Sequence, residues 1–164
     1  MIHRLFHCAI RTGQPERMKN FYTRIAGMMV DARRPQVPVK GFWLRPAAPG
    51  GDAIIHVFSD EDALTPDGRI PTGGGAVHHL SFLTKGYHET RARIEQAGLS
   101  FRSSNLREVG LWQIFVHDPH GILVELTFEA ATEAGPEPSI PPDLEFDAQK
   151  IVWFDPAQYV VFDN

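Results

Sequence analysis

Four side chains in this sequence have the chemistry of metal ligands: His7, His56, His79 and Glu125. Each lies near the middle of a short stretch with the composition of a β-strand. Divalent metals bind neutral imidazole nitrogen and carboxylate oxygen, and such sites keep positions open for substrate oxygens. Two histidines with one carboxylate suit Fe(II) oxygen chemistry, whereas a fourth ligand favours Lewis-acid or proton-transfer chemistry. The residue types therefore predict one divalent ion, and Ni, Zn, Co, Mn and Fe(II) all suit them.

Alternation along the expected strands places all four candidates on one face, because neighbouring residues of a strand point to opposite sides. The residues between them are strongly apolar and suit packing under helices; they are Phe6, Cys8, Ile10, Ile55, Val57, Leu80, Phe82, Val124, Leu126 and Phe128. His78 falls in this second set and is expected to be a packing residue. Arg11 and Phe58 share the face of the candidates and are the expected substrate contacts: Arg11 either binds an anionic substrate group or is an exposed strand-end residue, and Phe58 either lines the pocket or packs in the core.

The elements that must position these residues occur in the same order in each half of the chain. The first half predicts a strand, a helix and three strands over residues 5–11, 15–26, 28–32, 41–45 and 52–58. The helix carries a stripe of apolar residues at helical spacing and starts at a proline. The second half predicts the same series over residues 77–84, 87–97, 99–104, 111–117 and 122–129. The chain is therefore expected to be of the α+β class.

The spacing of landmarks supports an internal duplication. His7 and His79 are 72 residues apart, Gly27 and Gly98 are 71 apart, and His56 and Glu125 are 69 apart. We therefore expect a first module over residues 1–58, a linker over 59–75, a second module over 76–129 and a proline-rich tail over 130–164. Two apolar runs in the tail, at 151–154 and 159–162, flank a turn and predict a terminal hairpin. Such an apolar hairpin must pack either on its own domain or on a second subunit, and we favour a contact in a homodimer.

Composition excludes several classes of function. The chain has 164 residues, 43% hydrophobic and 22% charged, as in a soluble globular protein. Its formal charge of -4 gives no support for nucleic acid or an anionic membrane as a partner. A single cysteine rules out an internal disulfide, and no apolar run has the length of a signal peptide or a membrane span. A cytoplasmic location is the expectation.

Three motifs in order along the chain resemble those of a known family. They are His7-Cys8-Ala9-Ile10 followed by residues 21–28, then His78-His79-Leu80-Ser81-Phe82, then the turn and strand of residues 118–126. Together they are similar to the vicinal oxygen chelate superfamily. That group includes glyoxalase I, methylmalonyl-CoA epimerase, type I extradiol dioxygenases, and fosfomycin and bleomycin resistance proteins. The resemblance covers about residues 3–129.

The resemblance implies two βαβββ modules that form a cupped mixed sheet around a central divalent metal. It carries ligand roles onto His7, His79 and Glu125. The remaining ligand position falls on His56, where members often have Glu or Gln. The terminal hairpin has no counterpart that the resemblance assigns.

Two classes of function follow from these residues. The first is a metal-dependent enzyme whose small substrate chelates the ion through adjacent oxygens, with glyoxalase-like isomerase or lyase chemistry. Glu125 or His56 would act in proton transfer, as a general base near neutral pH. Fe(II) extradiol ring cleavage is a variant of this class. The second class is a binding protein of the drug-resistance type, although members of that kind generally lack the ligand set.

Overall fold

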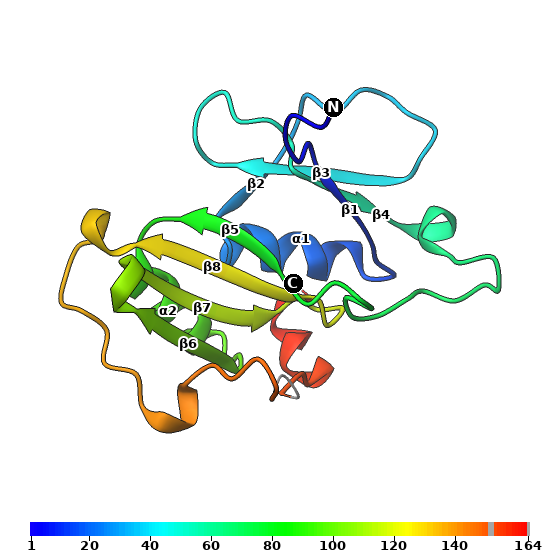
Figure 1. Ribbon diagram of the computed structural model, residues 1–164. Helices are drawn as coiled ribbons and strands as arrows, with labels where there is room; N and C mark the ends of the chain where they lie inside the picture. Colours follow the sequence, from blue (N-terminus) through cyan, green and yellow to red (C-terminus); the bar gives the residue numbers. More distant parts are fainter. Residues whose placement is uncertain (151–152, 164) are drawn as a thin grey trace. The chain divides into compact units, whose positions relative to one another are not determined.

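The computed structural model describes residues 1–150 and 153–163, which form two compact units (Figure 1). Among the described residues, the first unit comprises 1–71 and 162–163, and the second comprises 72–150 and 153–161. Each unit contains a four-stranded mixed sheet. The prediction of an α+β protein made of two βαβββ modules is confirmed.

The first unit follows the expected order of elements. These are β1 (Cys8–Arg11), α1 (Pro15–Arg24), β2 (Met28–Val30), β3 (Gly41–Pro46) and β4 (Ile55–Phe58). The strands lie side by side in the order β1-β4-β3-β2, with β1 and β4 parallel and the other pairs antiparallel. Pro15 begins α1, and Met18, Phe21 and Tyr22 are buried along one side of it. The apolar stripe read from the sequence is therefore the packed side of this helix.

The second unit repeats this arrangement. Its elements are β5 (Leu80–Thr84), α2 (Tyr87–Gln96), β6 (Phe101–Leu106), β7 (Leu111–His117) and β8 (Leu123–Glu129). The strand order is β5-β8-β7-β6, and β5 and β8 are the parallel pair. Gly27 and Gly98 follow the two helices at equivalent places, both with positive φ, +69° and +68°. Glycine adopts this conformation without the steric cost that a Cβ would bring.

The duplication extends to the register of the sheets. In the first unit, His56 of β4 lies opposite Ala9 of β1 and Trp43 of β3. In the second unit, Glu125 of β8 lies opposite Ser81 of β5 and Phe115 of β7. Ala9 and Ser81 each come two residues after a candidate histidine. The candidates of each unit therefore occupy matching positions, as the landmark spacing predicted.

The strands expected to carry His7 and His79 both start later than the sequence predicted. The strand expected over residues 5–11 begins at Cys8, and the one expected over 77–84 begins at Leu80. Leu5 and Phe6 are 79% and 61% exposed. The parallel partner β4 begins only at Ile55, after the Pro/Gly turn, so nothing is available to pair with earlier residues of the first strand. His7 and His79 consequently lie one residue before their strands, not in the middle of them.

His78 is not a packing residue of the covered face, contrary to expectation. It is exposed and lies before β5, where the strict alternation of a strand does not apply. Within β4 the alternation holds: Ile55 and Val57 are buried, while His56 between them and Phe58 beside them are partly exposed.

The predicted terminal hairpin is wrong for its second arm, and residues 151–152 of its first arm lie outside the described residues. Pro156–Phe162 forms a 3₁₀ helix. Asp155 accepts a hydrogen bond from the backbone of Ala157 at 2.9 Å, and Pro156 suits a first helical position. Tyr159 and Phe162 are both 2% exposed, while Val160 and Val161 between them are 58% and 45% exposed. Burial at every third residue fits a 3₁₀ helix and not a strand.

The first part of the tail belongs to the second unit and is not a separate region, contrary to the prediction. Residues 130–150, named here the tail segment, run along the second unit and contain short 3₁₀ helices at Ala130–Thr132 and Pro142–Leu144. Glu145 forms a parallel bridge with Ser103 of β6, so the segment covers part of an edge strand. In the part of the chain that is described, no helix has the length and apolar character needed to cross a bilayer.

Candidate metal centre

The second unit brings together two of the predicted ligands. His79, just before β5, and Glu125, in β8, approach each other with 3.1 Å between Nε2 and Oε2. Glu125 is buried and His79 is partly exposed. The parallel pairing of β5 with β8 places Ser81 opposite Glu125, which brings the end of β5 beside the carboxylate.

The carboxylate of Glu125 is fixed through one oxygen only. Its Oε1 accepts hydrogen bonds from Ser81 Oγ at 2.8 Å, Gln113 Nε2 at 2.7 Å and Thr127 Oγ1 at 2.6 Å. The three donors come from β5, β7 and β8, the three adjacent strands of this sheet. Oε2 is thereby turned to the side on which His79 lies. Outer partners of this kind orient metal-binding carboxylates in proteins.

This pair fits the chemistry of a divalent ion. Two donor atoms at right angles, each about 2.1 Å from one ion, lie about 3 Å apart. The nitrogen and oxygen of His79 and Glu125 have that separation. A direct hydrogen bond between an imidazole and a carboxylate gives a similar distance, so the geometry suits an ion without requiring one.

The first unit brings together the other two predicted ligands. The imidazole rings of His7 and His56 stack with centroids 3.8 Å apart and planes 16° from parallel. His56 also stacks on Trp43, its register partner in β3, at 4.0 Å and 5°. The two histidines therefore belong to one column of rings, and the column holds both imidazoles in parallel planes.

Two features of this histidine pair suit ligation. Burial, with smaller contributions from His7 and Arg34, lowers the pKa of His56 below its usual range. The imidazole of His56 is therefore neutral at pH 7, which is the form that binds metals. The Nδ1 atom of His7 is buried and has no hydrogen-bond partner among the described residues. A buried polar atom without a partner is uncommon in folded proteins and suits a nitrogen that meets a ligand.

The two pairs belong to different units. Within the described residues, no single cluster of three or more His, Cys, Asp or Glu side chains is arranged for an ion. His7 and His56 make one pair in the first unit, and His79 and Glu125 make one pair in the second. Arg11 and Phe58, the predicted substrate contacts, are register partners in β1 and β4, two residues beyond Ala9 and His56 on the same face.

Three further residues at these pairs escaped the sequence reasoning. Gln113 donates a hydrogen bond to Glu125, and the feature of the sequence that could have identified it is a single amide side chain in the apolar strand Leu111–His117. Trp43 stacks on His56, although tryptophan in a strand usually signals only core. Phe146 of the tail segment stacks on Phe115, with centroids 3.6 Å apart, and no pattern in the sequence pointed to this contact.

These observations define a duplicated βαβββ protein in which each module presents a pair of potential metal ligands at the same register. The chain belongs to the Glyoxalase/Bleomycin resistance protein/Dioxygenase superfamily, whose family model matches residues 4–126. Comparison with curated protein sequences gave no significant match.

Solved structures share the fold at low sequence identity. A glyoxalase family protein from Bacillus anthracis is 18% identical, with a TM-score of 0.56 over 79% of this chain and 97% of that one. Lactoylglutathione lyase from Agrobacterium tumefaciens is 15% identical, with a TM-score of 0.54 over 79% and 96%. An antibiotic-binding protein from Streptomyces sp. CB03234, TnmS3, is 22% identical, with a TM-score of 0.52 over 78% and 97%. Enzymes and binding proteins thus share this fold, and the site must decide between them.

Proposed function

We propose that this protein is a metal-dependent enzyme of the glyoxalase type, acting on a small substrate that chelates the ion through two neighbouring oxygens. His7, His56, His79 and Glu125 would hold one divalent ion, with Ni, Zn, Co, Mn or Fe(II) as candidates. When bound, such an ion supplies Lewis acidity toward the substrate oxygens. The reaction class is isomerase or lyase chemistry that moves a proton next to a carbonyl.

The observation that carries this proposal is the Glu125 carboxylate. Three donors hold Oε1, and Oε2 lies 3.1 Å from Nε2 of His79. A buried carboxylate has a desolvation cost that must be compensated, and ligation of a divalent ion by Oε2 of Glu125 and Nε2 of His79 would compensate it.

The chain's own residues would perform the remaining tasks. Glu125 or His56 would accept a proton from the substrate and return it at a neighbouring atom, as a general base and then a general acid. Arg11, exposed on the face of His56, would bind an anionic group of the substrate. Phe58, its register partner, would form an apolar wall beside it.

Elemental analysis of purified protein tests the proposal. We expect about one divalent ion per site in the wild type, a large loss in His79→Ala and Glu125→Gln, and a loss in His7→Ala and His56→Ala. His3→Ala is the matched control, because His3 is exposed and lies outside both pairs. Equal metal content in the wild type and Glu125→Gln would overturn the proposal. Activity screens with 2-oxoaldehyde–thiol adducts and 2-substituted acyl thioesters then identify the reaction.

Extradiol ring cleavage is the variant that the same ligands permit. It requires Fe(II), dioxygen and a catechol, and two histidines with one carboxylate suffice for it. Oxygen consumption with catechols by the Fe(II)-loaded protein separates it from the isomerase or lyase reaction. Four protein ligands leave less room for dioxygen, which favours the non-redox chemistry.

The second candidate function is binding of a drug or metabolite without chemistry. The aromatic column of Trp43, His56 and His7 favours it, because flat stacked rings suit a planar ligand. Ligand affinity that is unchanged by His7→Ala and Glu125→Gln, in a protein that holds no ion, would select this function.

We also propose that the protein is a homodimer. Leu83 of β5 is 69% exposed, and Phe6 and Leu5 are similarly open in the first unit. Exposed apolar side chains of this size are common at subunit contacts. Light scattering after size-exclusion chromatography tests the proposal, with a mass twice 18.4 kDa expected and a monomer contradicting it.

A further inference from the structure

The tail segment reaches the face of the second sheet that carries Glu125. The backbone N–H of Phe146 donates to the Ser103 carbonyl of β6 at 2.9 Å. The ring of Phe146 then lies flat on Phe115 of β7, with planes 7° from parallel. Phe115 is the register partner of Glu125, and paired residues of neighbouring strands share a face. The tail segment therefore covers the sheet directly beside the proposed ligand.

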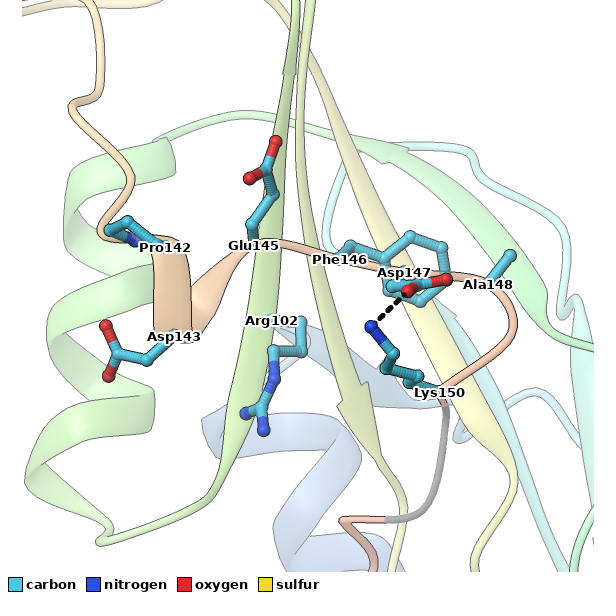
Figure 2. Close-up of a pocket in the computed structure, with 8 residues that line it drawn as sticks. All are labelled: Arg102, Pro142, Asp143, Glu145, Phe146, Asp147, Ala148 and Lys150. Carbon is cyan, nitrogen blue, oxygen red and sulfur yellow. Dashed lines mark ion pairs between the residues drawn. The ribbon is translucent and has the colours of Figure 1, made fainter.

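A tight turn over residues 147–150 follows Phe146. The backbone N–H of Lys150 donates to the Asp147 carbonyl at 2.9 Å, and that of Gln149 donates to Asp147 Oδ1 at 2.9 Å. Asp147, Ala148 and Lys150 of this turn line an open cavity of about 590 Å³. Asp147 and Lys150 form an ion pair at 3.0 Å, drawn as a dashed line in Figure 2. Ala148 lies within the turn, and its carbonyl meets the ring of His78.

His78 links the tail segment to His79. Its Nδ1 lies 2.8 Å from Nδ1 of His79, and its Nε2 lies 3.5 Å from the Ala148 carbonyl oxygen. The ring of Phe146 meets the ring of His78 edge-on, with centroids 6.4 Å apart. His78 is therefore held between the tail segment on one side and a proposed metal ligand on the other.

The carbonyl sets the direction of this chain of hydrogen bonds. A carbonyl oxygen only accepts, so Nε2 of His78 carries the hydrogen, and Nδ1 of a neutral His78 accepts. With an ion on Nε2 of His79, the hydrogen of that ring must lie on Nδ1, which donates to Nδ1 of His78 at 2.8 Å. Without an ion, Nε2 of His79 can instead donate to Glu125 Oε2, 3.1 Å away. The contact with His78 therefore favours the tautomer that binds the ion.

We propose that the tail segment positions His79 for metal binding through His78. The inference rests on the proposed metal site and deepens it. The family model ends at residue 126, so the tail segment lies outside the region of the chain that the model matches, whereas His78 and His79 lie inside it. His78 is a positioning residue, and the tail segment acts on the ion only through it.

Metal affinity is the first test, measured with Zn²⁺ by titration calorimetry on the full chain. His78→Phe keeps a flat ring but removes both nitrogens, and we expect it to bind Zn²⁺ about 10-fold or more weakly, as for other outer partners of metal ligands. His78→Asn retains an amide that can accept from His79, and it should recover part of the loss. Phe146→Ala should weaken binding in the same direction, because it frees the ring of His78.

Controls keep the result specific. His3→Phe makes the same substitution at an exposed histidine and should bind Zn²⁺ like the wild type. Thermal denaturation confirms that each variant is folded. Wild-type affinity in folded His78→Phe, together with a loss in Glu125→Gln, would overturn the positioning role while leaving the proposed function intact.

A second measurement reports the tautomers directly. Nitrogen-15 NMR of the Zn²⁺-loaded wild type at about pH 8, where imidazolium is depopulated, shows which nitrogen of each histidine carries a hydrogen. We expect Nε2 of His79 on the ion, with a hydrogen on its Nδ1 and a hydrogen on Nε2 of His78. Ligation of the ion by Nδ1 of His79, or a hydrogen on Nδ1 of His78, would overturn the inference. A wild type that binds no Zn²⁺ at all would overturn the proposed function and, with it, the inference that rests on it.

Discussion

The carboxylate of Glu125 uses its two oxygens differently. Oε1 accepts from three side chains, and Oε2 is directed to His79. The three donors define where the free oxygen points, so each of them contributes to the ligand geometry. The alternation of residues along the last strand identified Glu125 as a candidate. That alternation describes one strand only, so it could not identify the hydrogen-bond donors to Glu125 that come from other strands.

Gln113 gives the residue-scale prediction on this geometry. We expect Gln113→Met, which keeps the length of the side chain and removes its N–H donors, to lower Zn²⁺ affinity by about 10-fold. Loss of one hydrogen bond to a buried carboxylate should also lower the free energy of unfolding by about 1 to 3 kcal/mol. Calorimetry and urea denaturation measure the two effects. Gln96→Met, at an exposed helix end, is the control, and unchanged affinity in Gln113→Met would contradict the role of this donor.

His117 gives a residue-scale prediction on pH. It is 5% exposed, its Nδ1 has no hydrogen-bond partner among the described residues, and burial lowers its pKa to about 4. The unfolded chain, with an ordinary pKa near 6.5, therefore binds more protons between these values, and stability falls as the pH falls. We expect the wild type to lose about 2 kcal/mol between pH 7 and pH 5 from this group.

Urea denaturation at both pH values, on the wild type and His117→Phe, measures this loss. Phenylalanine retains a ring against Trp153 and Phe154 and cannot titrate. The variant should therefore show a smaller pH dependence than the wild type. The same substitution at the exposed His3 should leave the pH dependence unchanged, and an identical slope in His117→Phe would contradict the assignment.

At the scale of elements, helix α2 receives its N-terminal cap from the tail segment. Gly86 precedes the helix with φ of +81° and has no side chain to cap it. The carboxylate of Glu133 accepts from the backbone N–H groups of Gly86, at 3.0 Å, and Tyr87, at 2.6 Å. Two N–H groups without helical partners are thereby satisfied, and a negative charge lies at the positive end of the helix dipole.

Removing this cap should destabilise the second unit. We expect Glu133→Ala to lower the free energy of unfolding by about 1 to 2 kcal/mol, and Glu133→Gln by less, because the amide oxygen still accepts. Glu129→Ala, at an exposed position of β8, is the matched control. A Glu133→Ala variant as stable as the control in urea denaturation would show that solvent replaces the cap.

The sequence predicted helices and strands well where apolar residues repeat with a single helical or strand spacing. The helix at Pro15 and the strand Leu111–His117 follow from apolar spacing, and the latter was predicted with the same bounds. The tail was misread because Tyr159 and Phe162 suit a strand by residue type, while their burial three residues apart makes a 3₁₀ helix. Contacts such as Phe146 on Phe115 link residues far apart in sequence and leave no local period.

At the scale of the whole molecule, duplication explains why each unit holds half of the proposed ligand set. His7 and His56 occupy the same register in the first sheet as His79 and Glu125 in the second. The residue types have diverged at one position only, from histidine at 56 to glutamate at 125. If each of the two modules supplies two ligands, the proposed site has four ligands in total, and the proposal rests on this duplication.

Hydrogen exchange followed by mass spectrometry tests whether both modules contribute ligands to one ion. If one ion takes ligands from both units, saturating Zn²⁺ should slow exchange in β1 and β4 as well as in β5 and β8, since an ion that binds only the folded state stabilises by about 2.7 kcal/mol at 100 times its Kd. His7→Ala should abolish the protection in both sheets. Protection confined to β5 and β8, unaffected by His7→Ala, would mean that His79 and Glu125 bind the ion alone. The first unit would then supply its aromatic column to the substrate and not to the metal.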